Sequence, residues 1–266
     1  MSFRDSRKYS AHALLEVVRR EQVTPHMVRL TVTGDDLAEF PDRGYDQWFR
    51  MFLPKHDADQ ALKKLPERVD MIGWLKFMRV PEATRPVMRN YTVRQFRKAE
   101  RELDIDFVVH GDEGIAAPWA RSAEPGDRLA IIDQGTGFEL DPAVETHLLA
   151  GDETALPAIL GILRDLPRHH RGIAYIELPD AADEQQHEAP DGFEVRWLVR
   201  PADAAAGTLA LRVVKDEWAL PQEPFDAYLV GEQALATGLR RHLVTELKVP
   251  KHRVTFVGYW RIGKAD

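Results

Sequence analysis

The chain has 266 residues, of which 44% are hydrophobic and 30% charged, so it has enough apolar material for roughly two domains and is not globally disordered. Its formal net charge of −7 disfavours a protein that binds nucleic acid through bulk positive charge. Because the chain contains no cysteine, it cannot form disulfides, cysteine-bound zinc sites or iron–sulfur clusters. The longest apolar run, residues 155–163, is far shorter than the roughly 20 residues of a membrane-spanning helix, which predicts a cytoplasmic protein without membrane insertion.

In the first half of the chain, apolar and polar residues alternate with a period of two, which is typical of half-buried strands. Strands are expected at residues 14–20, 27–33, 47–53, 88–96, 103–109 and 128–132, with one short helix at 116–123. Six strands with little helix predict an antiparallel β-barrel. Residues 54–86 break the alternation and are interpreted as a partly helical insertion.

The second half alternates strands with helices, which predicts a parallel sheet covered by helices. Strands are expected at residues 147–150, 173–178, 195–199, 226–230 and 254–259, and helices at 154–166 and 234–247. The acidic stretch 179–192 is expected to be a loop. Asp141-Pro142 interrupts both patterns, so the domains are expected at residues 1–142 and 143–266. No metal site is expected, since H-E-x-x-H is absent and His169-His170 is interpreted as a solvated helix end.

One strand carries an unusual set of side chains, Arg89-Asn90-Tyr91-Thr92-Val93-Arg94. Arg89, Tyr91 and Val93 lie on one face of a strand. An arginine beside a tyrosine can hold a phosphate while the ring covers a flat ligand, and the Thr92 hydroxyl can hydrogen-bond a ring nitrogen. An exposed barrel strand of ordinary β-forming residues is the alternative interpretation.

Two further segments have glycines or helix starts where a phosphate can bind. In His110-Gly111-Asp112-Glu113-Gly114, the glycines let the backbone approach a ligand, and the helix that follows offers free N–H groups. Residues 151–158 lie where a parallel strand ends and its helix begins, which is where open α/β sheets bind ligands. A third and weaker candidate, Gly231-Glu232, also lies at the end of a strand and before a helix. A tight turn and a capped helix remain the alternatives.

Taken together and in order, these segments resemble the siderophore-interacting proteins, flavin-dependent ferric-siderophore reductases of the ferredoxin–NADP reductase superfamily. The resemblance covers about residues 14–264 and rests on the R-x-Y-[ST] box at Arg89, on Pro125-Gly126-Asp127, on Gly151-Asp152-Glu153-Thr154-Ala155-Leu156-Pro157, and on the terminal Gly258-Tyr259-Trp260-Arg261. It implies an FAD-binding barrel followed by an α/β domain that binds NADPH or NADH.

The resemblance also implies roles for individual residues. Arg89 would pair with the FAD pyrophosphate, while Tyr91 and Thr92 would lie against the isoalloxazine and act at the reacting ring. The other residues that the resemblance assigns to FAD or the nicotinamide cofactor are Val93, Arg94, His110, Gly111, Gly114, Ala116, Ala117, Trp119, Asp152, Thr154, Ala155, Gly231, Glu232 and Trp260. Arg50, Arg121 and Arg261 would bind the ferric siderophore, and Arg196, Arg200 and Lys215 are candidates for contacts that distinguish NADPH from NADH.

The function expected from this resemblance is NAD(P)H-dependent, FAD-containing reduction of imported ferric siderophores, releasing iron as Fe(II). Two alternatives remain open at this point. One is a general NAD(P)H:flavin oxidoreductase that serves another acceptor. The other is a siderophore-binding module without catalytic activity.

Overall fold

The computed structural model describes residues 12–55, 58–63, 65, 71–109 and 114–264. The chain forms two compact units: the first runs to residue 136, apart from the short segments 24–26 and 44–46, and the second contains those segments and residues 137–266. The units therefore divide a few residues before the position expected from the sequence. None of the helices in the described residues is long and apolar enough to cross a membrane.

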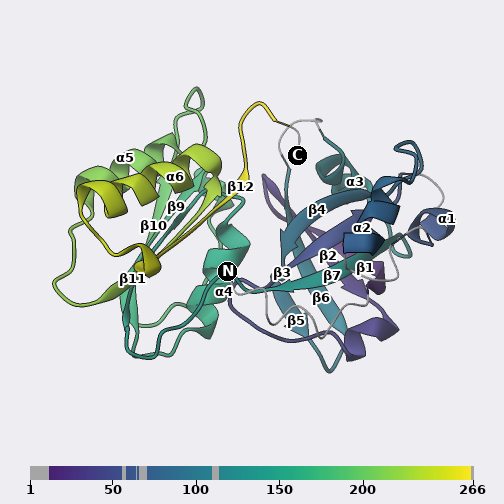
Figure 1. Ribbon diagram of the computed structural model, residues 1–266, viewed down its shortest axis with the longest axis horizontal. Helices are drawn as coiled ribbons and strands as arrows, with labels where there is room; N and C mark the ends of the chain where they lie inside the picture. The colour runs from purple at the N-terminus through teal and green to yellow at the C-terminus, as the bar shows by residue number, and fades with distance from the viewer. Residues whose placement is uncertain (1–11, 56–57, 64, 66–70, 110–113, 265–266) are drawn as a thin grey trace. The chain divides into compact units, whose positions relative to one another are not determined.

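The first unit is built on a seven-stranded antiparallel sheet with the order β4-β3-β7-β1-β2-β6-β5 (Figure 1). Its strands are β1 (Ala13–Thr24), β2 (Met27–Thr33), β3 (Trp48–Leu53), β4 (Val87–Thr92), β5 (Gln95–Arg97), β6 (Glu102–Val108) and β7 (Arg128–Gly135). The predicted antiparallel β-domain is confirmed. The strand expected at 88–96 is two strands, β4 and β5, which raises the number from six to seven.

The break between β4 and β5 occurs because the chain changes its pairing partner there. β4 pairs with β3 and β5 pairs with β6, so these consecutive strands lie at opposite edges of the sheet. Between them, Val93 N donates to Gln47 O at 2.7 Å and Arg94 N donates to Asp104 O at 3.0 Å. The two residues thus connect the two edge strands of the sheet through the chain, an arrangement that is also found in closed barrels.

Alternation along β6 follows the prediction for its apolar residues but not for its acidic ones. Leu103, Ile105 and Phe107 are fully buried in the barrel core. Asp104 and Asp106, between them, are also buried, because arginines of neighbouring strands pair with them. Arg29 donates to both oxygens of Asp106 at 2.6 and 2.8 Å, and Arg97 makes the same type of contact with Asp104.

The insertion between β3 and β4 contains two short helices, α1 (Ala58–Leu62) and α2 (Met71–Met78). Phe77 of α2 contacts Phe52 of β3 edge-to-face, with 5.5 Å between ring centroids. Leu62 and Leu65 join them in a separate cluster against Ile132 of β7. The predicted partly helical insertion is therefore confirmed, and it covers the face of β3 and β7 that points away from the barrel core.

The second unit is a five-stranded parallel sheet with the order β10-β9-β8-β11-β12, as predicted. Its strands are β8 (Thr146–Gly151), β9 (Arg171–Leu178), β10 (Gly192–Val199), β11 (Phe225–Glu232) and β12 (Val254–Trp260). Helix α4 (Leu156–Asp165) packs on one face, and α5 (Thr208–Glu217) and α6 (Gln233–Arg241) pack on the other (Figure 1).

Helix α5 has no counterpart among the elements expected from the sequence. Its buried face consists of only Ala210, Val213 and Val214, and β-branched valines weaken a helical signal. Its N-terminus is capped by a residue distant in the chain: the Glu177 carboxylate accepts from Gly207 N at 2.7 Å and from Ala210 N at 2.8 Å. A cap supplied by a neighbouring strand leaves no local sequence pattern.

His170 differs from its interpretation as part of a solvated helix end. It is buried, and its Nδ1 lies 2.8 Å from Nε2 of the buried His147 on β8. Burial, followed by the charge of His170, lowers the pKa of His147 to about 4. The pair is therefore a neutral hydrogen-bonded contact inside the second unit at physiological pH.

A buried carboxylate attaches the segment 44–46 to the second unit. Asp46 accepts from the backbone N–H groups of Gly137 and Phe138 and from the Tyr228 hydroxyl at 2.6 Å. The Tyr228 hydroxyl in turn lies 2.9 Å from that of Tyr259. Burial raises the pKa of Asp46, and these donors counteract that shift.

We expect Tyr228→Phe to lower the free energy of unfolding by about 1.5–3 kcal/mol, because it removes a hydrogen bond to a buried carboxylate. Tyr259→Phe is the matched control, since its hydroxyl contacts the Tyr228 hydroxyl and the loss should be smaller. Urea unfolding of both variants measures the difference. Equal losses would show that Asp46 does not depend on the Tyr228 hydroxyl.

Candidate functional site

Arg89 and Tyr91 lie on the same face of β4, as predicted. In the register of the sheet, Arg89 is opposite Met51 and Tyr91 is opposite Phe49, and both of these β3 residues are fully buried in the barrel core. Tyr91 and Val93 pack against that core. Arg89 and Tyr91 are themselves only half-buried, so this face is accessible at its margin.

An aromatic cluster joins this strand to the segment expected to hold a dinucleotide. The Tyr91 ring lies 4.5 Å from the Phe107 ring, and Phe107 lies 6.1 Å from Trp119 on helix α3 (Ala116–Ser122). Tyr91 and Trp119 are partly exposed, whereas Phe107 is fully buried. Sequence reasoning placed Phe107 on a strand but missed that it connects the two predicted segments.

The two arginines of the box differ in their surroundings. Arg94 Nε lies 3.5 Å from Asp106, the carboxylate that Arg29 also holds. No carboxylate among the described residues lies within 4 Å of Arg89, whose Nη1 donates to the carbonyl of Met88 at 2.8 Å. Arg89 is thus the arginine whose remaining donors suit a phosphate.

Thr92 and the start of α3 flank this face. Thr92, the last residue of β4, is buried opposite Trp48, and Ala116 is buried while Ala117 is partly exposed. Gly114 has a φ of +82° with open space around its Cβ position, so its conformation rather than crowding requires glycine. The predicted residues His110 and Gly111 lie outside the described residues.

The three arginines expected to bind a siderophore come from three different elements. Arg50 lies between Phe49 and Met51 on β3, so its side chain is on the face opposite Arg89 and Tyr91, and burial lowers its pKa. Arg121 lies in the last turn of α3. Arg261 is exposed just beyond β12, in the second unit.

In the second unit, Asp152 connects the carboxyl ends of three strands. Its fully buried carboxylate accepts from Thr154 N at 2.9 Å, from Glu232 N at 2.6 Å and from Trp260 Nε1 at 3.1 Å. Burial and the neighbouring charge of Glu153 raise the pKa of Asp152 to about 6. Asp152 therefore faces protein donors from the loop after β8, from β11 and from β12.

Gly231 and Glu232 have structural roles at the same place. Gly231 has a φ of +111°, and a Cβ there would lie 2.8 Å from the Asp152 carboxyl group. Glu232 caps helix α6, because its carboxylate accepts from the backbone N–H groups of Ala234 and Leu235. Because Gly231 has no side chain, the Asp152 carboxylate can approach the backbone of β11.

Helix α4 begins differently from α5 and α6. Ala155 precedes it without a side-chain cap, and Ala155 N donates to the backbone carbonyl of Asp152 at 2.9 Å. Thr154 is partly exposed. Among α4, α5 and α6, α4 is thus the helix without a carboxylate on the N–H groups of its first turn, although Asp152 accepts from Thr154 N just before it and Pro157 has no N–H.

A buried ion pair, not identified from the sequence, involves Glu153 in the loop between β8 and α4. Arg200 follows β10 and donates to both oxygens of Glu153 at 2.6 and 2.7 Å, and it lies 3.5 Å from Glu177. Arg196 instead pairs with Glu194 and Glu217, and Lys215 with Glu246. The hydrogen bonds of Arg200 raise its pKa.

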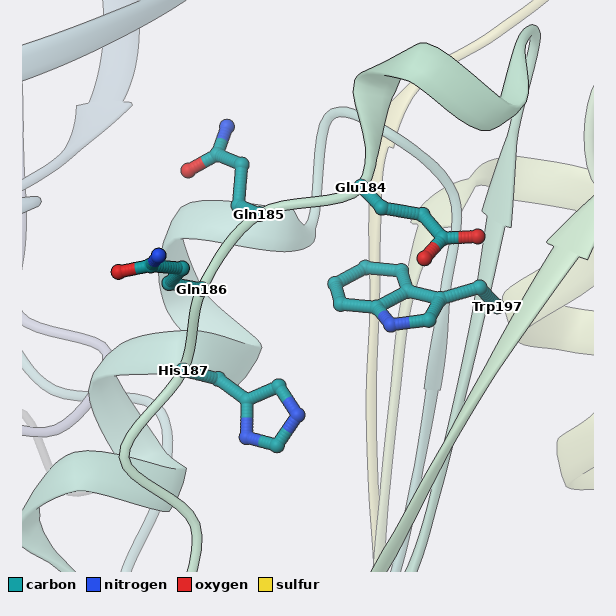
Figure 2. A pocket seen from close by; sticks show the side chains of 5 residues that line it. All are labelled: Glu184, Gln185, Gln186, His187 and Trp197. Atoms are coloured by element: carbon teal, nitrogen blue, oxygen red, sulfur yellow. The ribbon is translucent and has the colours of Figure 1, made fainter.

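Beside β10 there is an open cavity of about 510 Å³, lined by residues 184–187 and Trp197. Figure 2 shows the side chains of Glu184 and His187 on the same side of the segment as the Trp197 indole, and both glutamines pointing away. The ring centroids of His187 and Trp197 are 6.3 Å apart. The cavity offers aromatic surface and a carboxylate.

The residues present fit both dinucleotides. The first unit has half-exposed aromatic rings next to an arginine without a carboxylate partner among the described residues, as a flavin and its phosphates require. The second has a parallel sheet whose first helix starts without a capping side chain, as a nicotinamide dinucleotide requires.

Comparisons with known proteins agree with this arrangement. Residues 16–137 match the model of the siderophore-interacting FAD-binding domain, and residues 144–263 match that of the siderophore-interacting protein. The ferric vibriobactin reductase ViuB of Vibrio cholerae is 34% identical over 95% of this chain and 90% of its own length. The NADPH-dependent ferric-chelate reductase of Escherichia coli is 28% identical over 92% of this chain and 91% of its own.

Among solved structures, the siderophore-interacting protein SipS of Aeromonas hydrophila superposes with a TM-score of 0.77 and 31% identity, covering 96% of this chain and 93% of that one. Both halves of the chain thus match one family, in the order that the resemblance implied. The chain belongs to the siderophore-interacting protein family, whose first domain is an FAD-binding domain.

Proposed function

We propose that this protein is an FAD-dependent oxidoreductase that uses NAD(P)H to reduce ferric siderophores and releases iron as Fe(II). The observation that carries the proposal is the half-exposed Arg89–Tyr91 face beside Trp119. Similarity to the ferric vibriobactin reductase and the ferric-chelate reductase supports the choice of substrate. The proposed place of action is the cytoplasm.

In the first unit, Arg89 would hold the FAD pyrophosphate and Tyr91 would support the flavin ring. Contact with Phe107 fixes the Tyr91 ring, and burial raises the Tyr91 pKa well above its ordinary value, so the phenol stays neutral. Thr92 would donate its hydroxyl near the reacting edge of the ring. Val93, Arg94, His110, Gly111, Gly114, Ala116, Ala117 and Trp119 complete the proposed flavin site.

In the second unit, the N-terminus of α4, next to Thr154 and Ala155, would receive the pyrophosphate of the nicotinamide dinucleotide. The N–H groups of Thr154 and Ala155 donate to Asp152, so the phosphate donors would come from the first turn of the helix. Asp152 would act indirectly, since its carboxylate is buried and accepts from protein groups. It would hold Trp260 by the indole N–H and keep Gly231 and Glu232 in place.

The overall reaction balances as one NAD(P)H giving two electrons and one proton, with two Fe(III) chelates each taking one electron. Bound FAD supplies the change from two-electron to one-electron transfer. The chain contains no cysteine, so we propose direct transfer to the chelate without an iron–sulfur cluster.

The deciding experiment follows the absorption of the purified protein loaded with FAD under anaerobic conditions. NADH or NADPH should bleach the flavin, and a ferric siderophore should then restore its colour with formation of Fe(II). Reoxidation only by an added protein carrier would favour a general flavin reductase. A protein that binds siderophore but no FAD would be a binding module.

We expect Arg89→Ala to weaken FAD binding about tenfold or more, because a charge-assisted hydrogen bond to phosphate contributes about 1.5–3 kcal/mol. Quenching of flavin fluorescence in a titration of the apoprotein measures the dissociation constant. Arg101→Ala is the control, since Arg101 pairs with the exposed Asp35. An affinity for FAD equal to that of the wild type would remove Arg89 from the site.

We expect the stability conferred by Asp152 to depend on pH. Its pKa is raised in the folded protein, so the unfolding free energy should fall as pH rises from about 4 to about 6 and the buried group ionises. Asp152→Asn cannot titrate, so the wild type should lose about 1–3 kcal/mol more than this variant over that range. Urea unfolding at each pH measures this, with the exposed Asp191→Asn as control.

We expect the KM for a negatively charged ferric chelate to rise about threefold or more between low and high ionic strength, because salt screens its attraction to Arg50, Arg121 and Arg261. Replacing each arginine by glutamine should flatten this dependence. An uncharged ferric chelate provides the control. A KM for the anionic chelate that does not change with salt would contradict the role of these arginines.

A further inference from the structure

Two of the three helices that begin at the carboxyl end of the parallel sheet are closed to a phosphate. Glu177 occupies the N-terminus of α5 through Gly207 N and Ala210 N, and Glu232 occupies that of α6 through Ala234 N and Leu235 N. Helix N-termini are the usual phosphate sites of this fold class. Of these three described helices, α4 is the one without a carboxylate at its N-terminus, and the pyrophosphate would use it.

The basic residue that directly follows β10 is also paired with carboxylates. Both Nη atoms of Arg200 donate to Glu153, which is 2% exposed, and Glu177 lies 3.5 Å from the same guanidinium. These three groups carry a formal charge of −1. A further phosphate would have to break a buried bidentate pair to reach Arg200.

Two other basic residues lie beyond the carboxyl end of a more distant strand of the sheet. Arg261 and Lys264 come after β12, which is separated from β9 by β8 and β11. Three strand spacings amount to about 14 Å. Neither residue therefore follows β9 or β10, the strands beside which a doubly wound sheet places the adenosine ribose.

An acidic residue lies where a basic residue would be needed to bind a 2′-phosphate. Asp180 is exposed two residues after β9, the second strand of the unit, where an acidic side chain accepts the ribose 2′-hydroxyl of NADH in dinucleotide-binding sheets. One oxygen of Asp180 accepts from Ala182 N at 2.8 Å. A carboxylate has about four acceptor positions, so it can also accept from a ribose.

One 3-10 turn separates Asp180 from the cavity beside β10. The turn, Ala181–Asp183, leads to Glu184, which lines the cavity with His187 and Trp197 (Figure 2). The indole and imidazole rings provide surfaces for a flat base, and the Glu184 carboxylate can accept from an exocyclic amino group. Adenine has both features. A second carboxylate here also disfavours a phosphate.

We infer that this protein selects NADH over NADPH, with Asp180 and the Trp197 cavity holding the adenosine half and the Glu153–Arg200 pair excluding a 2′-phosphate. The inference rests on the proposed function, because it assigns a donor to that reaction. It also separates this chain from its NADPH-dependent relative.

The test uses two probes that lack the nicotinamide ring, ADP-ribose and 2′-phospho-ADP-ribose, in calorimetric titrations of the FAD-loaded protein. ADP-ribose should bind at least about tenfold more tightly, which corresponds to one hydrogen bond to a charged group. Equal affinities, or tighter binding of the phosphorylated probe, would overturn the inference. So would reduction of the flavin by NADH without measurable binding of ADP-ribose.

Three variants test which residues determine the preference between the two probes. Glu153→Gln should tighten binding of 2′-phospho-ADP-ribose with little effect on ADP-ribose, because it removes the bidentate partner of Arg200 and one negative charge beside it. The exposed Asp180→Asn does not risk the fold and should weaken ADP-ribose about fivefold or more, reducing the ratio between the probes. Trp197→Ala should weaken both probes and leave the reaction with reduced nicotinamide mononucleotide unchanged.

Asp191→Asn is the matched control, since Asp191 is exposed and precedes β10 at the other end of the strand. A change in Asp191→Asn as large as in Asp180→Asn would show that net charge alone sets the preference and would overturn the assignment. Failure of the proposed function gives a different result: the flavin stays oxidised with both NADH and NADPH, whichever probe binds.

Discussion

Buried carboxylates organise the carboxyl end of the parallel sheet, and the second unit depends on them. Asp152 accepts from groups after β8, on β11 and on β12, while Glu177 and Glu232 each cap a helix. Each carboxylate has several N–H donors, which offset part of the cost of burying it away from water. The same contacts leave α4 as the helix start that can accept a dinucleotide phosphate, so the support of the fold also limits where ligands bind.

The first unit uses charge in a comparable way. Asp104 and Asp106 are buried within β6 and bind arginines of neighbouring strands, which leaves Arg89 as the arginine of its box without a carboxylate partner in the described part of the chain. The Tyr91 ring is fixed by Phe107 and remains partly exposed. A rigid aromatic surface beside an available guanidinium is what a flavin dinucleotide requires, and the family match assigns FAD to this unit.

Sequence periodicity was sufficient for the strands of both sheets, because a period of two and the strand–helix alternation are local patterns. It was insufficient where partners distant in the chain decide the structure. The break at Val93 and Arg94 depends on Gln47 and Asp104, helix α5 depends on Glu177, and burial of His170 depends on His147. For the site, Arg89, Tyr91 and Trp119 came from motif spacing, whereas the role of Phe107 as the common neighbour of Tyr91 and Trp119 did not.

The sequence by itself determined the two-unit architecture, the absence of cysteine chemistry and the order of the motifs that identify the family. Only the tertiary structure decided which charged side chains are available to ligands. Asp152, Glu153 and Arg200 appear in the sequence as candidate ligand contacts or ordinary charges. In the structure, Arg200 pairs with the buried Glu153, and the buried Asp152 accepts from Glu232 N and Trp260 Nε1. The physical reason is that the availability of a charged group depends on its partners in space, and these partners lie up to 108 residues away in the chain.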